Sequence, residues 1–361
     1  MPELNEYKCP ACGGAMEFDS AAQKMKCPFC DTEIDISAFS DIDGSAESGS
    51  SGKESSWEAQ SQVWDGGEAE DFRIYVCESC GGEIVADETT GASACPFCGN
   101  KVVMKGQFSG ELKPDYIIPF KLDKKAAKEA YKKHITGKKF LPKVFSSENH
   151  INEIKGIYVP FWLFDIDVNA DISYHAEVIR KWQDKDYEYM EVKSYACRRA
   201  GSIGFEHLPC DGSKKMDDSL MESIEPYGFQ DAVPFNSAYL AGYMADRYDV
   251  DMDSRKQRAA DRVKKSAEIS MGKTVSGYTH VRVEQSTVNI QNARYQYALY
   301  PVWLLNSTWK GQKFTFAMNG QTGKLVGNLP IDNGAFWRYV IAGTGIIGAV
   351  VYAALAIFMN L

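Results

Sequence analysis

The sequence lacks several features that mark common classes of protein. Residues 1–8 contain no apolar run, so we expect no cleavable secretory signal. The five histidines show no mutual spacing, and no Ser–His–Asp arrangement can be argued from them. The segment 320–324 (GQTGK) has Met318 and Leu325 next to it, where a phosphate-binding loop needs glycine and Ser or Thr. We therefore expect a hairpin turn there, and an ATPase or helicase role has no support.

Positive charge is scarce in the two segments that carry most of the cysteines. The formal net charge of the chain is −9 at pH 7. Residues 1–35 contain three lysines against seven acidic residues, and residues 72–100 contain one arginine against four. Acidic segments repel phosphate groups, so nucleic acid is not the partner that these segments favour.

Eight of the ten cysteines form four Cys-x2-Cys pairs. They are Cys9, Cys12, Cys27, Cys30, Cys77, Cys80, Cys95 and Cys98. In each set of four, 14 residues separate the two pairs, and the second set repeats the first 68 positions later. Two thiolates two residues apart on a tight turn can reach one cation, and two such turns complete a tetrahedral shell. The spacing predicts two zinc ribbons, each holding one Zn²⁺.

Three other uses of these cysteines compete with zinc. Disulfides need an oxidising compartment, which the absence of a signal segment argues against. Redox-active pairs are not typical as four copies at mirrored spacing. A rubredoxin-like iron site also uses four thiolates, but it usually has a longer gap between the pairs and an aromatic core. Zinc is the favoured interpretation, and each site would contribute about 10 kcal/mol of binding free energy to folding.

A long apolar run lies near the other end of the sequence. Residues 339–359 carry no charge, and 21 residues of α-helix span about 31 Å, enough to cross the hydrocarbon core of a bilayer. Trp337 and Tyr339 lie at its start, as interfacial residues do. The alternative is a buried helix of a soluble domain, which normally carries polar residues on one face. The run predicts one transmembrane helix that contacts the lipid bilayer.

The charge next to this run predicts its orientation. Arg338 precedes the run and no positive residue follows it, which favours a cytoplasmic N-terminal side. Reduced, metal-binding cysteines favour the same side. We therefore expect a single-pass, tail-anchored protein of the cytoplasmic membrane with its N-terminal region in the cytosol.

The middle of the chain contains two basic segments. Residues 101–143 hold 12 lysines, four acidic residues and no arginine. A helix is expected at 124–136, with Asp123 as its N-cap and Gly137 after its end. A second basic helix is expected at 254–271. Both basic faces are either solvated or, in a membrane-tethered protein, close to anionic lipid headgroups.

Alternating and apolar segments predict antiparallel sheets with helices packed on one side. Strands are expected at 157–168, 171–180, 187–197, 278–290, 297–309, 312–318 and 324–326. Pro119-Phe120 and the segment 157–164 bracket the first basic helix, and Pro234-Phe235 and the segment 299–305 bracket the second. This echo indicates two related α+β subdomains.

The remaining reactive residues are interpreted as structural. Cys197, His207 and Cys210 would need a fourth ligand to bind a metal, and buried free thiols are common in cytosolic proteins. The acidic stretch 211–225 contains paired carboxylates, but it reads as a capped and solvated helix. No catalytic or cofactor-binding residue is assigned, and we expect a protein that is not an enzyme.

The expected fold is multidomain, with small β ribbons, an α+β region and one transmembrane helix. The divisions are zinc ribbon 1 at 1–36, a flexible acidic linker at 37–71, zinc ribbon 2 at 72–104, the α+β region at 105–335 and the transmembrane tail anchor at 336–361.

The paired cysteine turns, the segments 116–120 (YIIPF) and 156–162 (GIYVPFW), and the apolar tail together resemble a bacterial family. This family is described as transcription-factor-IIB-type zinc-ribbon-containing proteins that are anchored in the membrane. The resemblance covers essentially the whole chain. It implies a role beside phage-shock-protein-A-like membrane-stress factors, with recruitment of such a factor to the membrane. Asp31 departs from the pattern, because glycine follows the second cysteine of the other three pairs.

The leading hypothesis is a non-catalytic, zinc-stabilised adaptor that scaffolds protein partners at the cytoplasmic face of the membrane. The alternative is a nucleic-acid-binding regulator that uses the ribbons and the basic segment 101–143. An enzyme that uses the α+β region is a third hypothesis.

Overall fold

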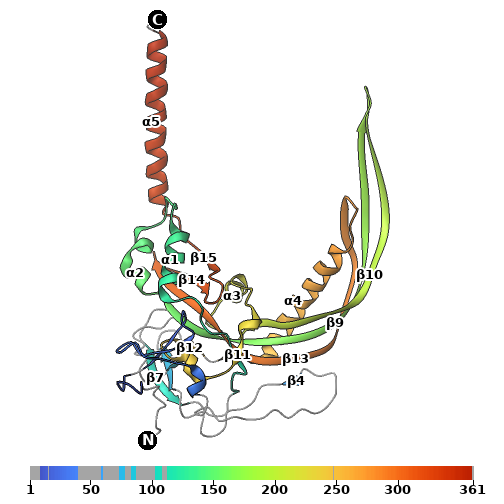
Figure 1. The fold of residues 1–361 in the computed structure, drawn as a ribbon. Coiled ribbons are helices and arrows are strands. Elements are labelled where there is room, and N and C mark those ends of the chain that lie inside the picture. Colours follow the sequence, from blue (N-terminus) through green and yellow to red (C-terminus); the bar gives the residue numbers. More distant parts are fainter. Residues whose placement is uncertain are drawn as a thin grey trace.

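The structure is a computed structural model, and it describes residues 9–14, 16–39, 58–59, 73–77, 83–86, 102–107, 112–246 and 248–359. Figure 1 shows a strand-rich core, a long curved β-arm on one side of it and the helix α5 (Asn333–Met359) on the other. The architecture therefore combines antiparallel sheet with helices and one apolar C-terminal helix.

Two long strands form the centre of the main sheet. β9 (Lys155–Gln183) pairs antiparallel with β13 (His280–Trp309) along most of its length. β10 (Glu188–Asp211) returns along β9, and β14 (Gln312–Asn319) returns along β13 before β15 (Leu325–Gly327). The predicted pairs of strands at 157–168 and 171–180, and at 278–290 and 297–309, are each one continuous strand. No glycine or proline interrupts the residues between them, so the pairing continues, with bulges between Val283 and Gln285 and between Ile290 and Asn292.

The central part of the sheet is buried on both faces. On one face Tyr158 and Trp162 pack in a cluster with residues of α1 (Lys124–Ile135) and α4 (Met252–Lys273). On the other face Val159 and Phe161 pack with Met221 of α3 (Asp218–Ser223). The prediction of helices on one side of the sheet was therefore wrong. The run of apolar residues around position 160 was the signal, because a strand buried on both faces does not alternate.

The two basic helices lie where the sequence predicted them. Asp123 caps α1 by accepting a hydrogen bond of 2.7 Å from the backbone N–H of Ala126. Asp251 caps α4 in the same way, accepting one of 2.7 Å from Ser254. After α1 the chain forms the 3-10 turn η3 (Lys143–Ser146) and then a shorter helix, α2 (Glu148–Asn152).

The two halves of the region from 116 to 319 repeat one set of contacts around the central strand pair. Val159 lies opposite Tyr300, Pro160 opposite Leu299 and Tyr158 opposite Pro301. The similar segments 159–162 (VPFW) and 300–303 (YPVW) therefore pair with each other. β8 (Tyr116–Ile117) runs parallel to β13, and β12 (Met244–Asp246) runs parallel to β9. The arrangement is therefore an approximate twofold, with each short strand on the long strand of the other half.

Hydrogen bonds repeat the same relation. The indole N–H of Trp162 donates to the carbonyl of Val250 over 2.9 Å, and that of Trp303 donates to the carbonyl of Leu122 over 3.1 Å. Gly212 N–H donates to Pro160 O, and Gly320 N–H donates to Pro301 O, both over 2.8 Å. The two indole bonds thus join each half to a backbone carbonyl of the other, and the two glycine bonds repeat within each half.

This arrangement changes the interpretation of the sequence echo. The structural counterpart of Phe120 is Tyr248, which packs on Trp162 with ring centroids 5.0 Å apart, as Phe120 packs on Trp303 at 5.1 Å. Pro234-Phe235, the expected counterpart, lies instead at β11 (Val233–Pro234), which pairs with β8. The two related halves therefore share one sheet, in which the short strand of each half pairs with the long strand of the other.

Residues 9–39 form a small module that is docked on this core. β1 (Glu17–Asp19), β2 (Lys24–Lys26) and β3 (Glu33–Ile34) make a three-stranded antiparallel sheet, followed by the 3-10 helix η1 (Ile36–Phe39). Phe18 packs edge-on against Tyr239, with ring centroids 5.2 Å apart, and its N–H donates to Ala241 O over 3.0 Å.

Further strands come from the region between this module and β8. β5 (Arg73–Cys77) pairs antiparallel with β6 (Glu83–Ala86) and with β7 (Val102–Gln107), and β6 pairs with β12 of the core. Within the expected linker at 37–71, the structure describes the end of η1 and β4 (Glu58–Ala59), which pairs with β13.

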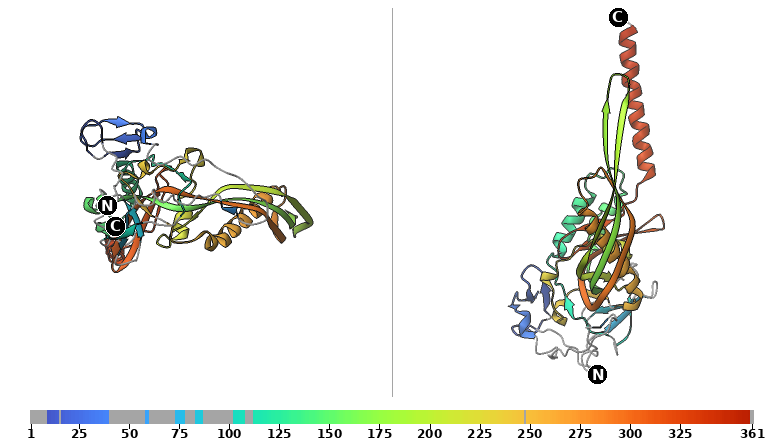
Figure 2. Two further views of the ribbon diagram at one scale, coloured as in Figure 1. Left: turned by 90° about the horizontal axis from the view of Figure 1, so that it is seen from below. Right: turned by 90° about the vertical axis from the view of Figure 1, so that its right-hand side faces the viewer.

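The β9–β10 hairpin extends beyond the core as a curved arm, with β13 beside its lower part. Figure 1 and the right-hand view of Figure 2 show that the arm and α5 extend from the core in the same direction. Trp182 and Tyr189 lie opposite each other near its tip and stack with ring centroids 5.6 Å apart. Both side chains are about half exposed, and Tyr187 is more exposed still.

Candidate metal centre

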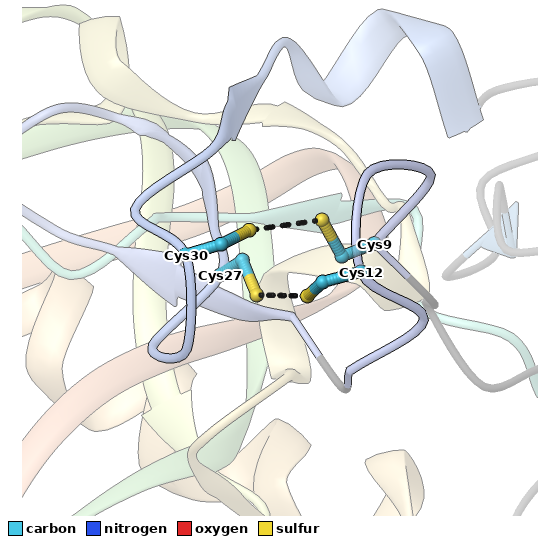
Figure 3. A group of neighbouring side chains, drawn as sticks. All are labelled: Cys9, Cys12, Cys27 and Cys30. Atoms are coloured by element: carbon cyan, nitrogen blue, oxygen red, sulfur yellow. Dashed lines mark hydrogen bonds between the residues drawn. The ribbon is translucent and has the colours of Figure 1, made fainter.

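The first four cysteines converge on one point between two turns. Cys9 Sγ lies 3.5 Å from Cys30 Sγ, and Cys12 Sγ lies 3.5 Å from Cys27 Sγ, as Figure 3 shows. All four sulfur atoms are within 4.8 Å of one another. Cys9 and Cys27 are buried, whereas Cys12 and Cys30 are exposed at the rim.

This spacing matches a tetrahedral metal site. Four sulfurs at about 2.3 Å from a central Zn²⁺ would lie about 3.8 Å from one another. The four cysteines can therefore bind one metal ion with little movement of the turns. The donor set consists of sulfur alone, which is typical of a closed structural site rather than a catalytic one with an open position.

The backbone forms the same turn at both pairs. Gly13 N–H donates to Cys9 O over 2.7 Å, and Asp31 N–H donates to Cys27 O over 2.9 Å. Gly13 has φ +74° and Asp31 has φ +56°, so both residues adopt the left-handed conformation. Aspartate tolerates this region better than most residues. The replacement of glycine by Asp31 therefore leaves the turn geometry intact.

The thiols influence one another strongly. Hydrogen bonds from the Thr32 side chain and backbone lower the pKa of Cys30 to about 6. The Gly14 amide lowers the pKa of Cys12, but the sulfurs of Cys30 and Cys27 raise it to a net value of about 12. Four ionised thiolates at this spacing would repel one another, and a divalent cation removes that repulsion.

The cysteine turns are tied to the core through the small sheet between them. Cys9, Cys27, Phe18 and Met25 belong to one buried cluster with Ala238 and Ala241 of the core. Tyr243 contacts this cluster and also stacks on Phe120, with ring centroids 4.2 Å apart and planes 8° from parallel. The metal centre is therefore continuous with the core, and sequence spacing alone did not indicate this contact.

The second predicted metal centre falls mostly outside the described residues. Cys77 is the last residue of β5. Cys80, Cys95 and Cys98 lie outside the ranges that the structure describes. The second Zn²⁺ therefore stays a prediction.

Cys197, His207 and Cys210 do not converge. Cys197 and Cys210 lie at distant positions of β10, opposite Tyr174 and Trp162 of β9. Cys197 Sγ contacts the hydroxyl of Tyr278 at 3.3 Å, and the ring of His207 stacks on Phe229. Burial raises the pKa of Cys210 to about 11, so its thiol stays protonated at neutral pH and is a poor nucleophile.

A network of ion pairs joins α3 to α4, and the sequence interpretation missed it. Arg258 lies 2.8 Å from Glu222 and 3.0 Å from Asp218, and Arg262 lies 2.7 Å from Glu225. The expected solvated faces of both segments are thus partners of each other. The helical spacing of arginines in 255–262 against acids in 218–225 was the available signal.

α5 is long and apolar enough to cross a membrane, and none of its residues from Asn333 to Tyr352 is buried. Within the described residues it is the helix with this property. Ile341, Ile346, Ile347 and Val350 are each more than 60% exposed, which a core helix of a soluble protein would not be. Side chains beyond Tyr352 lie outside the description.

Comparison with known proteins relates the chain to an uncharacterized bacterial protein. No family model matches the chain, and no solved structure matches it. The uncharacterized protein YdjG of Bacillus subtilis (strain 168) is 32% identical over 339 residues, which cover 93% of this chain and 94% of YdjG. At that identity and coverage, the chain belongs to the same family as YdjG.

Proposed function

We propose that the protein is a tail-anchored membrane adaptor that binds a protein partner at the cytoplasmic face, with zinc as the metal of its cysteine centre. It has no catalytic role. The partner class is a phage-shock-protein-A-like factor, which the family resemblance of the sequence implies. The localisation would place that factor at the membrane during a membrane-stress response.

The exposed apolar helix carries this proposal. An unpartnered helix of this length and composition is stable beside a folded core when lipid covers it. The metal centre contributes a second argument, because an all-cysteine site stabilises structure and leaves no open coordination position for chemistry. Burial keeps the thiol of Cys210 protonated at neutral pH, which makes it a poor nucleophile and supports a non-catalytic role for this residue.

The module around the metal centre offers a surface for the partner. Phe29 lies between Cys27 and Cys30 and is 74% exposed, although its neighbours in the module are anchored to the core. A large aromatic side chain that is held rigidly and exposed is typical of the residues that dominate protein interfaces. We assign Phe29 to the partner-binding surface.

Flotation of vesicles tests the proposal. Full-length protein is reconstituted into phosphatidylcholine vesicles and mixed with a purified phage-shock-protein-A-like factor. Phosphatidylcholine has no net charge, so the lipid alone does not attract the factor electrostatically. The factor should float with loaded vesicles and not with empty ones. Phe29→Ser should weaken binding at least tenfold, as loss of an interface anchor does.

The matched control is Ile269→Ser on the outer face of α4, where an apolar side chain is also exposed. It should bind the factor like the unchanged protein. Equal binding by the Phe29 variant would remove that residue from the interface, and absence of the factor from loaded vesicles would overturn the proposed partner. A carbonate wash that releases the protein from vesicles would overturn the anchor.

A further inference from the structure

The base of α5 is held by a loop that is distant in sequence. Phe140 packs edge-on against Phe336 and Tyr339, with ring centroids 5.4 Å and 5.7 Å apart. The backbone N–H of Asp332 donates to Phe140 O over 2.8 Å. Figure 1 shows α1, α2 and the connection between them directly below α5. Residues 138–143 are therefore fixed where the helix leaves the core.

Positive side chains surround this contact. Lys138, Lys139 and Lys143 are exposed, and the Nζ atom of Lys139 lies 5.6 Å from the ring centroid of Tyr339. Arg338 adds a fourth cation from α5 itself. The ion pairs found among the described residues do not include these three lysines. Asp332 is an acidic residue at this contact, and its carboxylate accepts a hydrogen bond from Gly334 N–H at the start of the helix.

We infer that Lys138, Lys139, Lys143 and Arg338 form a basic collar that binds anionic phospholipid headgroups in the leaflet where α5 enters the membrane. The inference rests on membrane insertion of α5, as proposed above. Trp337 and Tyr339, both exposed, lie at the same level and suit the headgroup region. The cations therefore meet the layer in which lipid phosphates lie.

Charge and chemistry favour lipid over other anions. Lysine ammonium groups on flexible stems attract phosphate diffusely, whereas specific recognition of one phosphate usually uses the planar fork of arginine. Near a membrane surface every lysine or arginine is attracted to anionic lipid, and the attraction adds over the four cations. In the sequence next to the apolar run, Arg338 is the positive residue on the N-terminal side of α5. The collar adds three lysines to that side from residues 138–143. The folded domain thus reinforces the charge asymmetry that sets membrane orientation.

α4 does not place its positive side chains beside α5, although its sequence is also rich in lysine and arginine. Its arginines at 255, 258 and 262 are engaged with carboxylates of the segment 211–225. Its outward lysines, Lys264, Lys265 and Lys273, are exposed and lie on a helix that packs along the arm. They provide a charge-matched control.

Fluorescence quenching at Trp337 tests the collar. Full-length protein is placed in nanodiscs of mixed phosphatidylglycerol and phosphatidylcholine, and one of the two lipids is brominated in each sample. The fluorescence of Trp337 is obtained by subtracting the fluorescence of the Trp337→Phe variant from that of the unchanged protein. In the unchanged protein at low salt, brominated phosphatidylglycerol should quench Trp337 at least twice as strongly as brominated phosphatidylcholine at equal mole fraction. The triple variant Lys138→Gln, Lys139→Gln, Lys143→Gln should lose most of this preference, and 0.5 M salt should weaken it in the unchanged protein because the screening length shortens.

The control variant Lys264→Gln, Lys265→Gln, Lys273→Gln should keep the preference. Equal quenching by both lipids in the unchanged protein, or an unaltered preference in the collar variant, would overturn the inference while leaving the anchor intact. Absence of quenching by either lipid would instead show that α5 is not inserted, and the anchor and the collar would fail together.

Discussion

Asp211 and Asn319 occupy matching positions at the ends of β10 and β14, and they differ by one charge. Asp211 accepts a hydrogen bond from Ser213 N–H over 3.1 Å, and Asn319 accepts one from Gln321 N–H over 2.9 Å. Asn319 also donates to the carbonyls of Ile224 and Pro226. The second carboxylate oxygen of Asp211 is buried without a hydrogen bond, and Arg255 Nη2 lies 3.9 Å from it. Burial accordingly raises the pKa of Asp211 well above its usual range.

This comparison predicts a pH-dependent gain in stability for Asp211→Asn. A carboxyl whose pKa is raised on folding contributes stability below its unfolded pKa of about 4, and that contribution is lost as the pH rises. The amide keeps the bond to Ser213 and does not ionise. The variant should therefore gain about 1 kcal/mol over the unchanged protein at pH 8, and less at pH 5, by urea unfolding in detergent.

Asn319→Asp is the reverse control for this prediction. It loses two hydrogen bonds to carbonyls and places a carboxylate against them, so it should lose stability at pH 8 more than at pH 5. Shifts of equal size at both values of pH, in either variant, would show that ionisation is not the cause.

At the scale of elements, the module of residues 9–39 that carries the metal centre packs on the core segment 237–243. Because Phe18, Tyr239 and Tyr243 link the cysteine turns to Phe120, loss of the metal should loosen more than the turns themselves. Structural zinc sites of this type couple binding free energies on the order of 10 kcal/mol to folding.

Cys27→Ser is expected to remove about one equivalent of metal, as measured by elemental analysis, since the site loses a ligand. Hydrogen exchange should rise in residues 16–39 and in 237–243, and it should stay unchanged in the arm at 176–195. Cys197, which is half-buried on β10, provides the control through Cys197→Ser, which should retain the metal. Unchanged exchange at 237–243 after metal loss would contradict the coupling.

Elements of this chain were predictable where local patterns decide them. The first basic helix follows from its cap at Asp123 and the glycine after its end, and the second lies over the predicted range 254–271. The turns around Cys9 and Cys27 follow from cysteine spacing. The lengths of β9 and β13 were not predictable, because long-range pairing rather than a local stop signal decides where they end. The position of the collar lysines beside α5 was not predictable for a related reason, because Phe140 and Phe336 meet only in the folded chain. The sequence alone left two interpretations of the basic segment open, a solvated face and a face close to anionic lipid headgroups.

At the scale of the whole molecule, the exchanged halves should unfold together. Each short strand pairs with the long strand of the other half, α4 packs on β9 and β10, and Tyr131 of α1 packs on Phe316 of β14. Neither half therefore retains a closed core alone. Trp162→Phe and Trp303→Phe each remove one indole hydrogen bond and keep most of the ring packing. Each should cost about 1 kcal/mol.

Hydrogen exchange under mild denaturant measures this cooperativity. Either substitution should raise exchange in α1 and α4 alike, because the two helices belong to one unit. Trp182→Phe on the arm is the control and should leave both helices unaffected. A response confined to the helix that contacts the altered tryptophan would show that the halves open independently.

The exchange of strands between the two halves also has a consequence for biosynthesis. When β9 and β10 have left the ribosome, roughly 100 further residues must be translated before β13 can join them, which takes about 5 to 20 seconds at ordinary elongation rates. During that interval the hydrophobic flank of the hairpin, including Trp162 and its neighbours, faces the cytoplasm without its partner. Nascent chains of this protein should therefore depend on a ribosome-associated chaperone, and slowing translation between the halves should lengthen that dependence.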